Sequence, residues 1–392
     1  MQYTIFDYEK LAELSKEFET PCYIYDTQLL QSTIAQAQAA AEAHLKYPHQ
    51  IHYALKANDH PQLLQLIQKT GVGIDCVSGG EMEKALHAGF APQQMVFAGV
   101  GKQDWEIVLG INSGIHAFNC ESLQELEVIN ALSCERKLVA PVMLRINPDI
   151  DAKTHKHITT GNYANKFGSQ FEDVVSYLPR LQMLKNIKLL GLHYHIGSQI
   201  RDMQVFAKLA QTVTTHYKIF AKHGYPMREL DLGGGLGVDY VNPKLNPIPD
   251  FNAYFATINQ HLGVPSATKI HFELGRSLVA QSGILLGTVL FTKTTAGTKF
   301  AILDAGMNDF MRPALYDAIQ NIVVISQKHA SDNILPYHVV GPVCESTDIF
   351  AKDVVLPELQ RGDKVIIETS GAYGRVLASQ YNSRKLVQEY CI

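Results

Sequence analysis

The sequence lacks the features that mark membrane, secreted and nucleic-acid-binding proteins. No apolar run reaches the roughly 18 uninterrupted residues of a membrane span, and the N-terminus, MQYTIFDYEKLAELSKEF, has early acidic residues and no apolar signal-peptide core. The formal net charge is -4, so there is no excess of basic residues to attract a polyanion. We therefore expect a cytoplasmic protein with neither a membrane nor a nucleic-acid partner.

Cysteine is scarce, and its spacing argues against two common uses. The chain has six cysteines and no C-x-x-C pair, which disfavours both a disulfide framework and a zinc knuckle. We interpret five of them as buried, inert thiols and treat Cys344 separately below. The five are Cys22, Cys76, Cys120, Cys134 and Cys391.

What the sequence does contain is a long alternation of short apolar runs with amphipathic segments. Hydrophobic residues make up 46% and charged residues 18% of the 392 residues, which is ordinary for a globular protein of about two domains. From Pro21 to Arg276, runs such as PCYIYD, QIHYALKA and GVGIDCV alternate with helical patterns such as HPQLLQLIQKTG. This alternation predicts a parallel (β/α)8 barrel over residues 23–276.

The pattern changes after Arg276. Segments such as GILLGTVLFTKTTAGTKFAILDAGM and RGDKVIIETSGAY are β-rich, turn-punctuated and poor in helices. They predict a mostly antiparallel β domain over residues 277–392. Residues 1–22 fit neither pattern, and we expect them to pack with the β domain. The predicted fold class is therefore α/β, a (β/α)8 barrel followed by a mostly antiparallel β domain.

Polar residues close the predicted barrel strands, at the end where the chemistry of such barrels takes place. Lys56 lies near the end of QIHYALKAN, a segment otherwise apolar enough to be buried on both faces. A lysine that reaches solvent from a strand end is the ordinary interpretation, and a reactive amine is the alternative. The further strand-end residues are Asp75, Asn119, Glu121, Arg145, Asn147, His193, His195, Asp231, Glu273 and Arg276.

Two of these strand-end residues also allow a metal-site interpretation. His193 and His195 share one face of a strand, and Asp75 and Glu273 can complete a ligand shell of the metal-hydrolase type. We keep this as an alternative and predict no metal. The closely spaced pair at residues 155 and 157, both histidine, is assigned no ligand role.

Glycines follow two of the predicted strands. DLGGGLG places Gly233, Gly234 and Gly235 after an apolar run, where bare backbone N–H groups and a helix N-terminus can bind a phosphate. ELGRS closes the next strand with Gly275 and Arg276, whose charge can neutralise that anion. A phosphate site late in a barrel, with a lysine at the end of its first strand, fits a phosphorylated aldehyde. Pyridoxal phosphate is the cofactor we predict.

Motifs in order along nearly the whole chain resemble one enzyme family. They are YALKAN, DCVSGGE, RINPDIDAKTH, NKFG, HYHIGSQI, DLGGGLG, ELGRSLVA, DAGMNDFMRPALY, GPVCESTDIFAKD and SGAYGRVLASQYNSR. The chain resembles the fold-type III, alanine-racemase-like pyridoxal-phosphate decarboxylases, and among them those that act on meso-2,6-diaminopimelate. The resemblance implies that Lys56 forms an aldimine with the cofactor, that His195 stacks on its ring and that Glu273 pairs with its pyridine nitrogen. It implies further cofactor contacts from Asp75, Ser198, Gly233, Gly234, Gly235, Gly275, Arg276 and Tyr373. The family shows Glu-Pro-Gly-Arg where this chain has Leu274 in place of the proline.

The chemistry of the implied site favours a decarboxylase over a racemase. A carboxylate at the pyridine nitrogen keeps that nitrogen protonated, so the ring accepts the electron pair left by departing CO2. A thiol is a competent donor for the returning proton, and Cys344, followed by Glu345, is our candidate. In the family this segment reaches into the partner subunit's site, so the resemblance implies a homodimer with shared active sites.

Charges at the far end of the substrate guide the expected specificity. Meso-diaminopimelate carries a second carboxylate and a second ammonium, so its pocket needs a fixed cation and a fixed anion. We expect Arg276 and Arg312 to supply cations, Glu345 the anion, and Tyr316 and Tyr373 hydroxyl contacts. A surface salt bridge is the alternative role for Arg312. The expected products are L-lysine and CO2, as in the last step of lysine biosynthesis.

Two alternatives to this function stay open. One is a decarboxylase of another basic amino acid, of the ornithine, arginine or carboxynorspermidine type. The other is a cofactor-binding relative that does not catalyse a reaction. A lone barrel of that kind ends near residue 276 and lacks Cys344, whereas this chain does neither.

Overall fold

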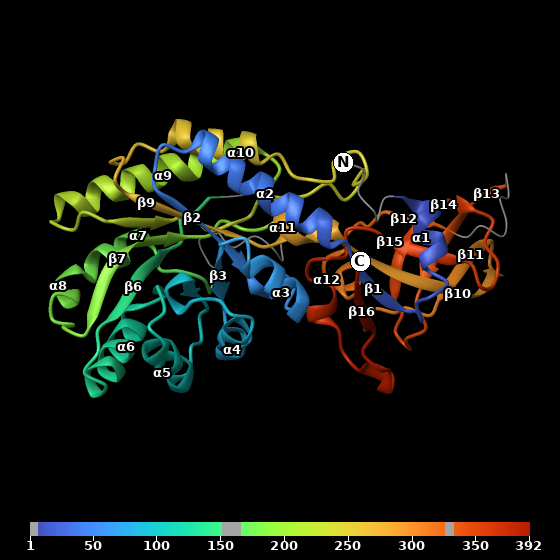
Figure 1. The fold of residues 1–392 in the computed structure, drawn as a ribbon, viewed down its shortest axis with the longest axis horizontal. Helices are drawn as coiled ribbons and strands as arrows, with labels where there is room; N and C mark the ends of the chain where they lie inside the picture. The colour runs from blue at the N-terminus through green and yellow to red at the C-terminus, as the bar shows by residue number, and fades with distance from the viewer. Residues whose placement is uncertain (1–6, 151–165, 326–332) are drawn as a thin grey trace. The chain divides into compact units, whose positions relative to one another are not determined.

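The structure is a computed structural model that describes residues 7–150, 166–325 and 333–392. It divides into two compact units, which Figure 1 shows as ribbons and which are described separately below. The barrel unit comprises Ile34–Gly237 and Asp250–Arg276, and the sheet unit comprises Met1–Thr33, Val238–Pro249 and Ser277–Ile392.

The barrel unit is built on a closed ring of eight strands, and each pair of neighbours is parallel. The ring closes where His52 of the first barrel strand pairs with Glu273 of the last. The predicted (β/α)8 barrel is therefore confirmed. Its strands are β2 (His49–Ala54), β3 (Gly73–Cys76), β4 (Met95–Phe97), β5 (Ala117–Cys120), β6 (Ala140–Ile146), β7 (Ile187–Tyr194), β8 (Glu229–Asp231) and β9 (Lys269–Leu274).

Helices alternate with these strands along the chain. Two of them begin with the same local device, a serine three residues before a glutamate. Ser78 Oγ accepts from Glu81 N and Ser122 Oγ accepts from Glu125 N, both at 3.2 Å, which caps the helices that follow β3 and β5. The helices are α2 (Thr27–His44), α3 (Pro61–Gln68), α4 (Gly79–His87), α5 (Asp104–Ser113), α6 (Leu123–Glu135), α7 (Phe171–Ser176), α8 (Leu178–Leu181), α9 (Met203–Lys222), α10 (Phe251–His261) and α11 (Arg276–Val279).

The barrel strands are buried along most of their length, as a parallel sheet covered by helices requires. Aromatic side chains of α10 pack onto β9: Phe255 meets Phe272 edge to face with ring centroids 5.0 Å apart, and Tyr254 meets it at 6.0 Å. Such packing fixes the strand that carries Glu273. Among the described residues, no helix combines the length and apolar character that crossing a bilayer requires.

The sheet unit contains the mostly antiparallel sheet that the sequence predicts. Its main path runs β12-β15-β10-β11-β13-β14, with β1 beside β10 and β16 beside β1. Within it, β11–β13 and β1–β16 are the parallel pairs. The strands are β1 (Cys22–Tyr25), β10 (Gly283–Thr295), β11 (Thr298–Leu303), β12 (Ile322–Val324), β13 (Ile334–Val340), β14 (Ile349–Pro357), β15 (Lys364–Ile367) and β16 (Gln388–Cys391), and the unit also holds α1 (Tyr8–Leu14) and α12 (Arg312–Tyr316).

The strand at Cys22–Tyr25 corrects one interpretation of the sequence. The run PCYIYD was counted with the barrel strands, but β1 pairs antiparallel with β10 and parallel with β16 in the sheet unit. All four of its residues are buried, so its sequence is equally typical of an interior strand in the barrel and in the second sheet. The N-terminal helix α1 lies beside it, with Leu11 and Ala12 in one apolar cluster with Ile284 and Ile366.

Candidate active site

Lys56 lies where the sequence places it, at the C-terminal end of the first barrel strand. β2 ends at Ala54, and the lysine follows in a short 3-10 turn at Leu55–Ala57. Its Nζ lies 3.4 Å from Oδ2 of Asp75, at the end of the neighbouring strand β3. The Lys56 side chain keeps 36% of its surface exposed, whereas that of Asp75 is fully buried. The Lys56 amine thus contacts a buried carboxyl group on one side, while part of its side chain stays accessible to solvent.

Asp75 is a buried carboxyl group that is a much weaker acid than an ordinary aspartate. Burial raises its pKa to about 8, helped by the charge of Glu273 and opposed by Lys56. One of its oxygens, Oδ1, has no hydrogen-bond partner among the described residues. Buried polar atoms in native proteins are rarely left without a partner, so this oxygen marks a position where a bound group can be received.

Glu273, on β9, is the centre of the polar cluster. Its Oε1 accepts from Asn119 Nδ2 at 3.0 Å, and its Oε2 lies 3.1 Å from His193 Nε2. Burial alone raises the pKa of Glu273, but His193 and Lys56 more than offset it, so the pKa falls below its ordinary value. Asp231 lies in the same group, and burial together with Glu273 raises its pKa well above the ordinary range. Of these two carboxyl groups, Glu273 therefore carries the negative charge and Asp231 is protonated.

The turn after β8 passes so close to Glu273 that only glycine, which has no Cβ, fits there. A Cβ on Gly234 would lie 1.9 Å from the carbonyl oxygen of Glu273, and one on Gly233 would lie 2.3 Å from that of Tyr194. Gly233 and Gly235 also have left-handed backbones, with φ of 65° and 110°. The expectation of a helix N-terminus at this turn is wrong, because the next helix in the chain, α10, begins only at Phe251. Two backbone N–H groups of the turn already have acceptors, because Gly233 N donates to Asp231 Oδ1 at 2.8 Å and Gly234 N donates to His195 Nδ1 at 3.4 Å. The N–H of Gly235 is the donor that this turn leaves for an anion.

His195 lies beside this turn. Its Nδ1 is 3.4 Å from the backbone N of Gly234, which donates to it. Burial, together with the charges of Lys56 and Arg145, lowers the pKa of His195 to about 3, so the imidazole is neutral. A neutral ring suits the predicted stacking role because it adds no second cation beside Lys56.

Arg276 provides a fixed cation at the end of the last barrel strand. It follows Gly275 as the first residue of α11, and it is buried. Its Nε and Nη2 both donate to Ser198 Oγ, at 3.1 and 3.0 Å. The structure thereby brings together the predicted phosphate-binding residues Ser198 and Arg276.

The remaining predicted residues belong to the sheet unit. Arg312 opens α12, is only 5% exposed, and lies with its guanidinium 4.5 Å from the ring centroid of Tyr240. Its Nη1 is 2.7 Å from the side-chain amide of Gln320. This burial disfavours the surface salt bridge kept as the alternative. Tyr316 and Tyr373 are half-buried, and Tyr373 has a left-handed backbone with φ of 55°.

Cys344 and Glu345 lie in an exposed but well-anchored loop. The buried Asp348 accepts from the backbone of Met307 at 2.6 Å and of Val343 at 2.7 Å. Cys344 N donates to Asn382 Oδ1 at 3.0 Å, and Glu345 Oε1 accepts from the Tyr381 hydroxyl at 2.5 Å. The loop therefore has a defined shape, while the Cys344 thiol stays on the surface of the single chain.

The other cysteines only partly match the expectation of buried thiols. Cys22, Cys76 and Cys120 are buried, and burial raises the pKa of each thiol. Cys134 is exposed and Cys391 is half-buried, so the expectation is wrong for both. Cys134 lies near the end of α6, where a helix pattern alone does not decide which side faces solvent.

Three residues that contact or neighbour Glu273 had no cofactor role in the sequence-based assignment. Asn119, His193 and Asp231 hold or share the charge of Glu273. Their signal was present, since each lies at the C-terminal end of a barrel strand. Of the residues considered for a metal-hydrolase site, His193 and Glu273 do come together, with Asp231 as the third member of the group, whereas His195 contacts the backbone of Gly234. The histidines at 155 and 157 lie outside the described residues.

Comparison with known proteins gives a consistent family assignment. Residues 31–280 match the family model described as "Pyridoxal-dependent decarboxylase, pyridoxal binding domain". Over 387 residues the chain is 44% identical to the diaminopimelate decarboxylase of Bacteroides thetaiotaomicron, covering 98% of each protein. It is 36% identical to that of Aquifex aeolicus, covering 97% of this chain and 89% of the relative.

Solved structures show the same similarity in three dimensions. The diaminopimelate decarboxylase of Helicobacter pylori, complexed with L-lysine, aligns with a TM-score of 0.89 at 39% identity, covering 97% of this chain and 93% of that one. A lysine/ornithine decarboxylase from Vibrio vulnificus aligns with a TM-score of 0.84 at 23% identity, covering 99% of both chains. The second similarity extends to the fold alone.

Proposed function

The chain belongs to the pyridoxal-dependent decarboxylases, and from this premise we propose that it removes CO2 from meso-2,6-diaminopimelate and releases L-lysine. One observation supports the proposal above the others. Glu273 is a buried carboxylate whose charge is maintained by Asn119 and His193, at the strand ends that also carry Lys56. Such an anion suits a cofactor ring that must stay protonated at its nitrogen.

The residues present fit pyridoxal phosphate. Lys56 offers an accessible amine beside a buried acid, and the turn Gly233–Gly235 offers the Gly235 N–H together with bare backbone where a side chain would collide with its neighbours. The buried atoms Asp75 Oδ1 and His193 Nδ1 have no partner among the described residues, as expected of groups that face a ligand. We assign Lys56 to the aldehyde, Glu273 to the ring nitrogen and His195 to the ring face. The phosphate is assigned to the glycine turn with Ser198, Gly275 and Arg276.

When bound, the cofactor supplies a protonated aromatic ring that takes up the electron pair released as CO2 departs. The chain's own residues set the conditions for this step. Glu273 would keep positive charge at the ring nitrogen, because its carboxylate is ionised and is hydrogen-bonded to Asn119 and His193. The neutral His195 would lie against the ring without competing for that charge. Asp75 lies 3.4 Å from the Lys56 amine and would orient it toward the aldehyde group.

Proton return is assigned to Cys344 of a second subunit. The loop that carries this thiol is anchored by Asp348 and exposed on the single chain, as is expected of a segment that completes a neighbour's site. We therefore propose a homodimer with two shared active sites, in which the Cys344 sulfur donates its proton to the substrate Cα and Glu345 binds the distal ammonium.

Specificity for the distal carboxylate is assigned to Arg312, with Arg276 as a second cation and with Tyr316 and Tyr373 as hydroxyl contacts. Arg312 is buried, and its guanidinium is oriented by the Tyr240 ring and by Gln320. A buried, oriented guanidinium pairs with a carboxylate through two parallel hydrogen bonds. Ornithine and arginine have no distal carboxylate, so this feature favours diaminopimelate over the substrates of the related decarboxylases.

The decisive experiment is incubation of the cofactor-loaded enzyme with meso-diaminopimelate, following both lysine and CO2. Equimolar products are expected, with ornithine, arginine and lysine as much poorer substrates. A Lys56→Ala variant serves as the inactive control, and borohydride should fix the cofactor to Lys56 in the wild type. Faster turnover of ornithine or arginine would favour the other basic-amino-acid decarboxylases. No turnover of any of these substrates by a yellow, cofactor-loaded protein would favour the non-catalytic relative.

We also propose that the enzyme works in the cytoplasm as part of lysine biosynthesis. Within the described part of the chain, five cysteines are not joined in disulfides: Cys22, Cys76, Cys120, Cys134 and Cys344. Cysteines kept in the thiol form suit a reducing compartment.

A further inference from the structure

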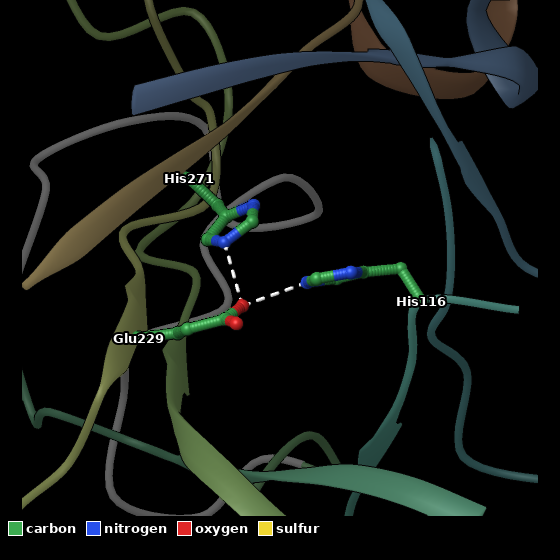
Figure 2. Close-up of side chains that lie close together, drawn as sticks. All are labelled: His116, Glu229 and His271. Carbon is green, nitrogen blue, oxygen red and sulfur yellow. Dashed lines mark hydrogen bonds and ion pairs between the residues drawn. The ribbon is translucent and has the colours of Figure 1, made fainter. Parts of the chain in front are cut away.

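A second polar cluster lies at the opposite end of the barrel strands from Lys56. It consists of His116, Glu229 and His271, here called the lower triad (Figure 2). His116 immediately precedes β5, Glu229 is the first residue of β8, and His271 lies two residues before Glu273 on β9. The reaction proposed above takes place at the C-terminal ends of the strands, so it does not use the lower triad.

The three side chains converge on one point. Glu229 Oε2 lies 2.7 Å from His116 Nε2 and 2.9 Å from His271 Nε2, and Figure 2 shows both imidazoles directed at this one oxygen. All three atoms lie within 4.8 Å of one another. His271 is fully buried, whereas the side chains of His116 and Glu229 keep 18% and 16% of their surface exposed, so a small ion from solvent can reach the centre.

The hydrogen bonds behind His271 leave the lower triad one proton short. His271 Nδ1 lies 2.8 Å from His52 Nε2, and His52 Nδ1 lies 3.2 Å from the backbone oxygen of Gln94. Three hydrogen-bond contacts in a row thus link the Gln94 oxygen, His52, His271 and the Glu229 oxygen, and each contact needs one proton. Two neutral imidazoles supply only two protons. A third proton would place a positive charge on one of two fully buried rings, which burial disfavours.

A metal ion resolves this mismatch. With an ion at His271 Nε2, His271 donates its Nδ1 proton to His52, and His52 donates its own to the Gln94 oxygen. Every ring nitrogen of His271 and His52 then has a partner, and both rings stay neutral. Such outward hydrogen bonds from a ligating histidine are the usual way in which proteins fix the ring and its tautomer.

We propose that the lower triad binds a divalent transition-metal ion through His116 Nε2, His271 Nε2 and one oxygen of Glu229. Two imidazoles and a carboxylate are a donor set suited to Zn2+, with water at the remaining positions. An ion about 2.1 Å from two ligand atoms separates them by about 3.0 Å at a right angle and about 3.4 Å at the tetrahedral angle. The two separations from Glu229 Oε2 are slightly shorter, so small side-chain rotations open the site.

Such an ion would cross-link β5, β8 and β9 at the mouth remote from the chemistry. Its expected effect is therefore on the stability of the barrel and not on the reaction. Occupancy at about a hundredfold above the dissociation constant should raise the Tm by on the order of 5 °C. Wild-type kcat with and without Zn2+ should agree within about twofold, because the barrel residues assigned to the cofactor lie at the opposite ends of the strands.

The test uses the cofactor-loaded enzyme after treatment with a chelator and dialysis. Zn2+ is titrated calorimetrically, and Co2+ is titrated by its visible absorption, which reports the ligand geometry. We expect one ion per chain and a higher Tm. Glu229→Gln and the milder His116→Gln should each abolish both the binding and the Tm shift. His338→Gln is the matched control, because His338 is 20% exposed and paired with Asp353 in the sheet unit, and it should leave both unchanged.

Two results would overturn the proposal. One is the absence of stoichiometric binding by the wild type, since the lower triad would then be a hydrogen-bonded plug. The other is binding that persists in both Glu229→Gln and His116→Gln, which would locate the ion elsewhere, for example at His193, Asp231 and Glu273.

Discussion

Replacing Glu273 with Gln removes one charge at the centre of the active site and changes little else in shape. The glutamine oxygen can still accept from Asn119, so the pocket should keep its form and the phosphate contacts are untouched. What is lost is the anion opposite the protonated ring nitrogen. Breaking a buried ion pair in this way costs about 3–5 kcal/mol, and with about 1.36 kcal/mol per decade the turnover should fall by about 150- to 5,000-fold.

The structure also predicts how the enzyme can partly compensate. Burial is the main cause of the raised pKa of Asp231 and the charge of Glu273 is the second, so removing the Glu273 charge should lower the Asp231 pKa and favour its ionised form. The ionised fraction of Asp231 can take over part of the role, which moves the single variant toward the lower end of the range. A Glu273→Gln/Asp231→Asn double variant should therefore lose more activity than Glu273→Gln alone.

The assay is kcat from lysine formation under saturating cofactor, with the visible absorption of the bound cofactor as a check on loading. Glu106→Gln is a matched control, because Glu106 is also a buried glutamate of the barrel unit but its hydrogen bonds within the described residues come from the backbone of Gly79 and Gln103. It should keep near-normal turnover. A fully loaded double variant that turns over like the wild type would refute the argument that a carboxylate at this position sustains the ring charge.

Three further predictions concern the subunit interface, the substrate and the fold. Inactive Lys56→Ala and Cys344→Ala variants, mixed and allowed to exchange subunits, should regain activity in about a quarter of their sites, because half the dimers are mixed and one site in each is intact; no recovery despite proven exchange would place the thiol in its own chain's site. Arg312→Ala should lower kcat/KM for meso-diaminopimelate by roughly a hundredfold or more while leaving the weak turnover of lysine nearly unchanged, since an unpaired buried carboxylate costs about 3–5 kcal/mol; an unchanged ratio of the two efficiencies would make Arg312 structural. Gly234→Ala should weaken cofactor binding and lower the Tm because its Cβ collides with the Glu273 carbonyl, whereas Gly101→Ala meets no atom within 4 Å and should be neutral; equal behaviour of the two variants in a cofactor titration would contradict the close approach.

The barrel and the positions of its key residues follow from the sequence because they depend on local order. Lys56, Asp75 and Glu273 each end an apolar run, and parallel strands bring such ends together at one rim. The placement of the Cys22–Tyr25 strand did not follow, because four buried residues in a row do not identify the sheet that they join.

Contacts between side chains from distant strands were also beyond the sequence pattern. Asn119 and His193 were recognisable as strand-end residues, but their bonds to Glu273 join positions 154 and 80 residues apart. The glycine turn resembled a helix start because its composition is shared by both structures, and only the backbone path shows that α10 begins later. The exposure of Cys134 depends on how a helix is rotated against its neighbours, which periodicity constrains only loosely.

The contact between Gly234 and the Glu273 carbonyl has a consequence for how such an enzyme can evolve. The turn that would receive the cofactor's phosphate and the strand that would receive its ring nitrogen touch through backbone, with no side chain between them. The distance between the phosphate-binding turn and the strand that carries Glu273 is thus set by the backbone. Point substitutions at either position change how strongly the cofactor is bound but not this distance. Variants selected to use a longer or shorter cofactor analogue should therefore carry insertions or deletions in the loop after β8, and libraries of single substitutions should fail to yield them.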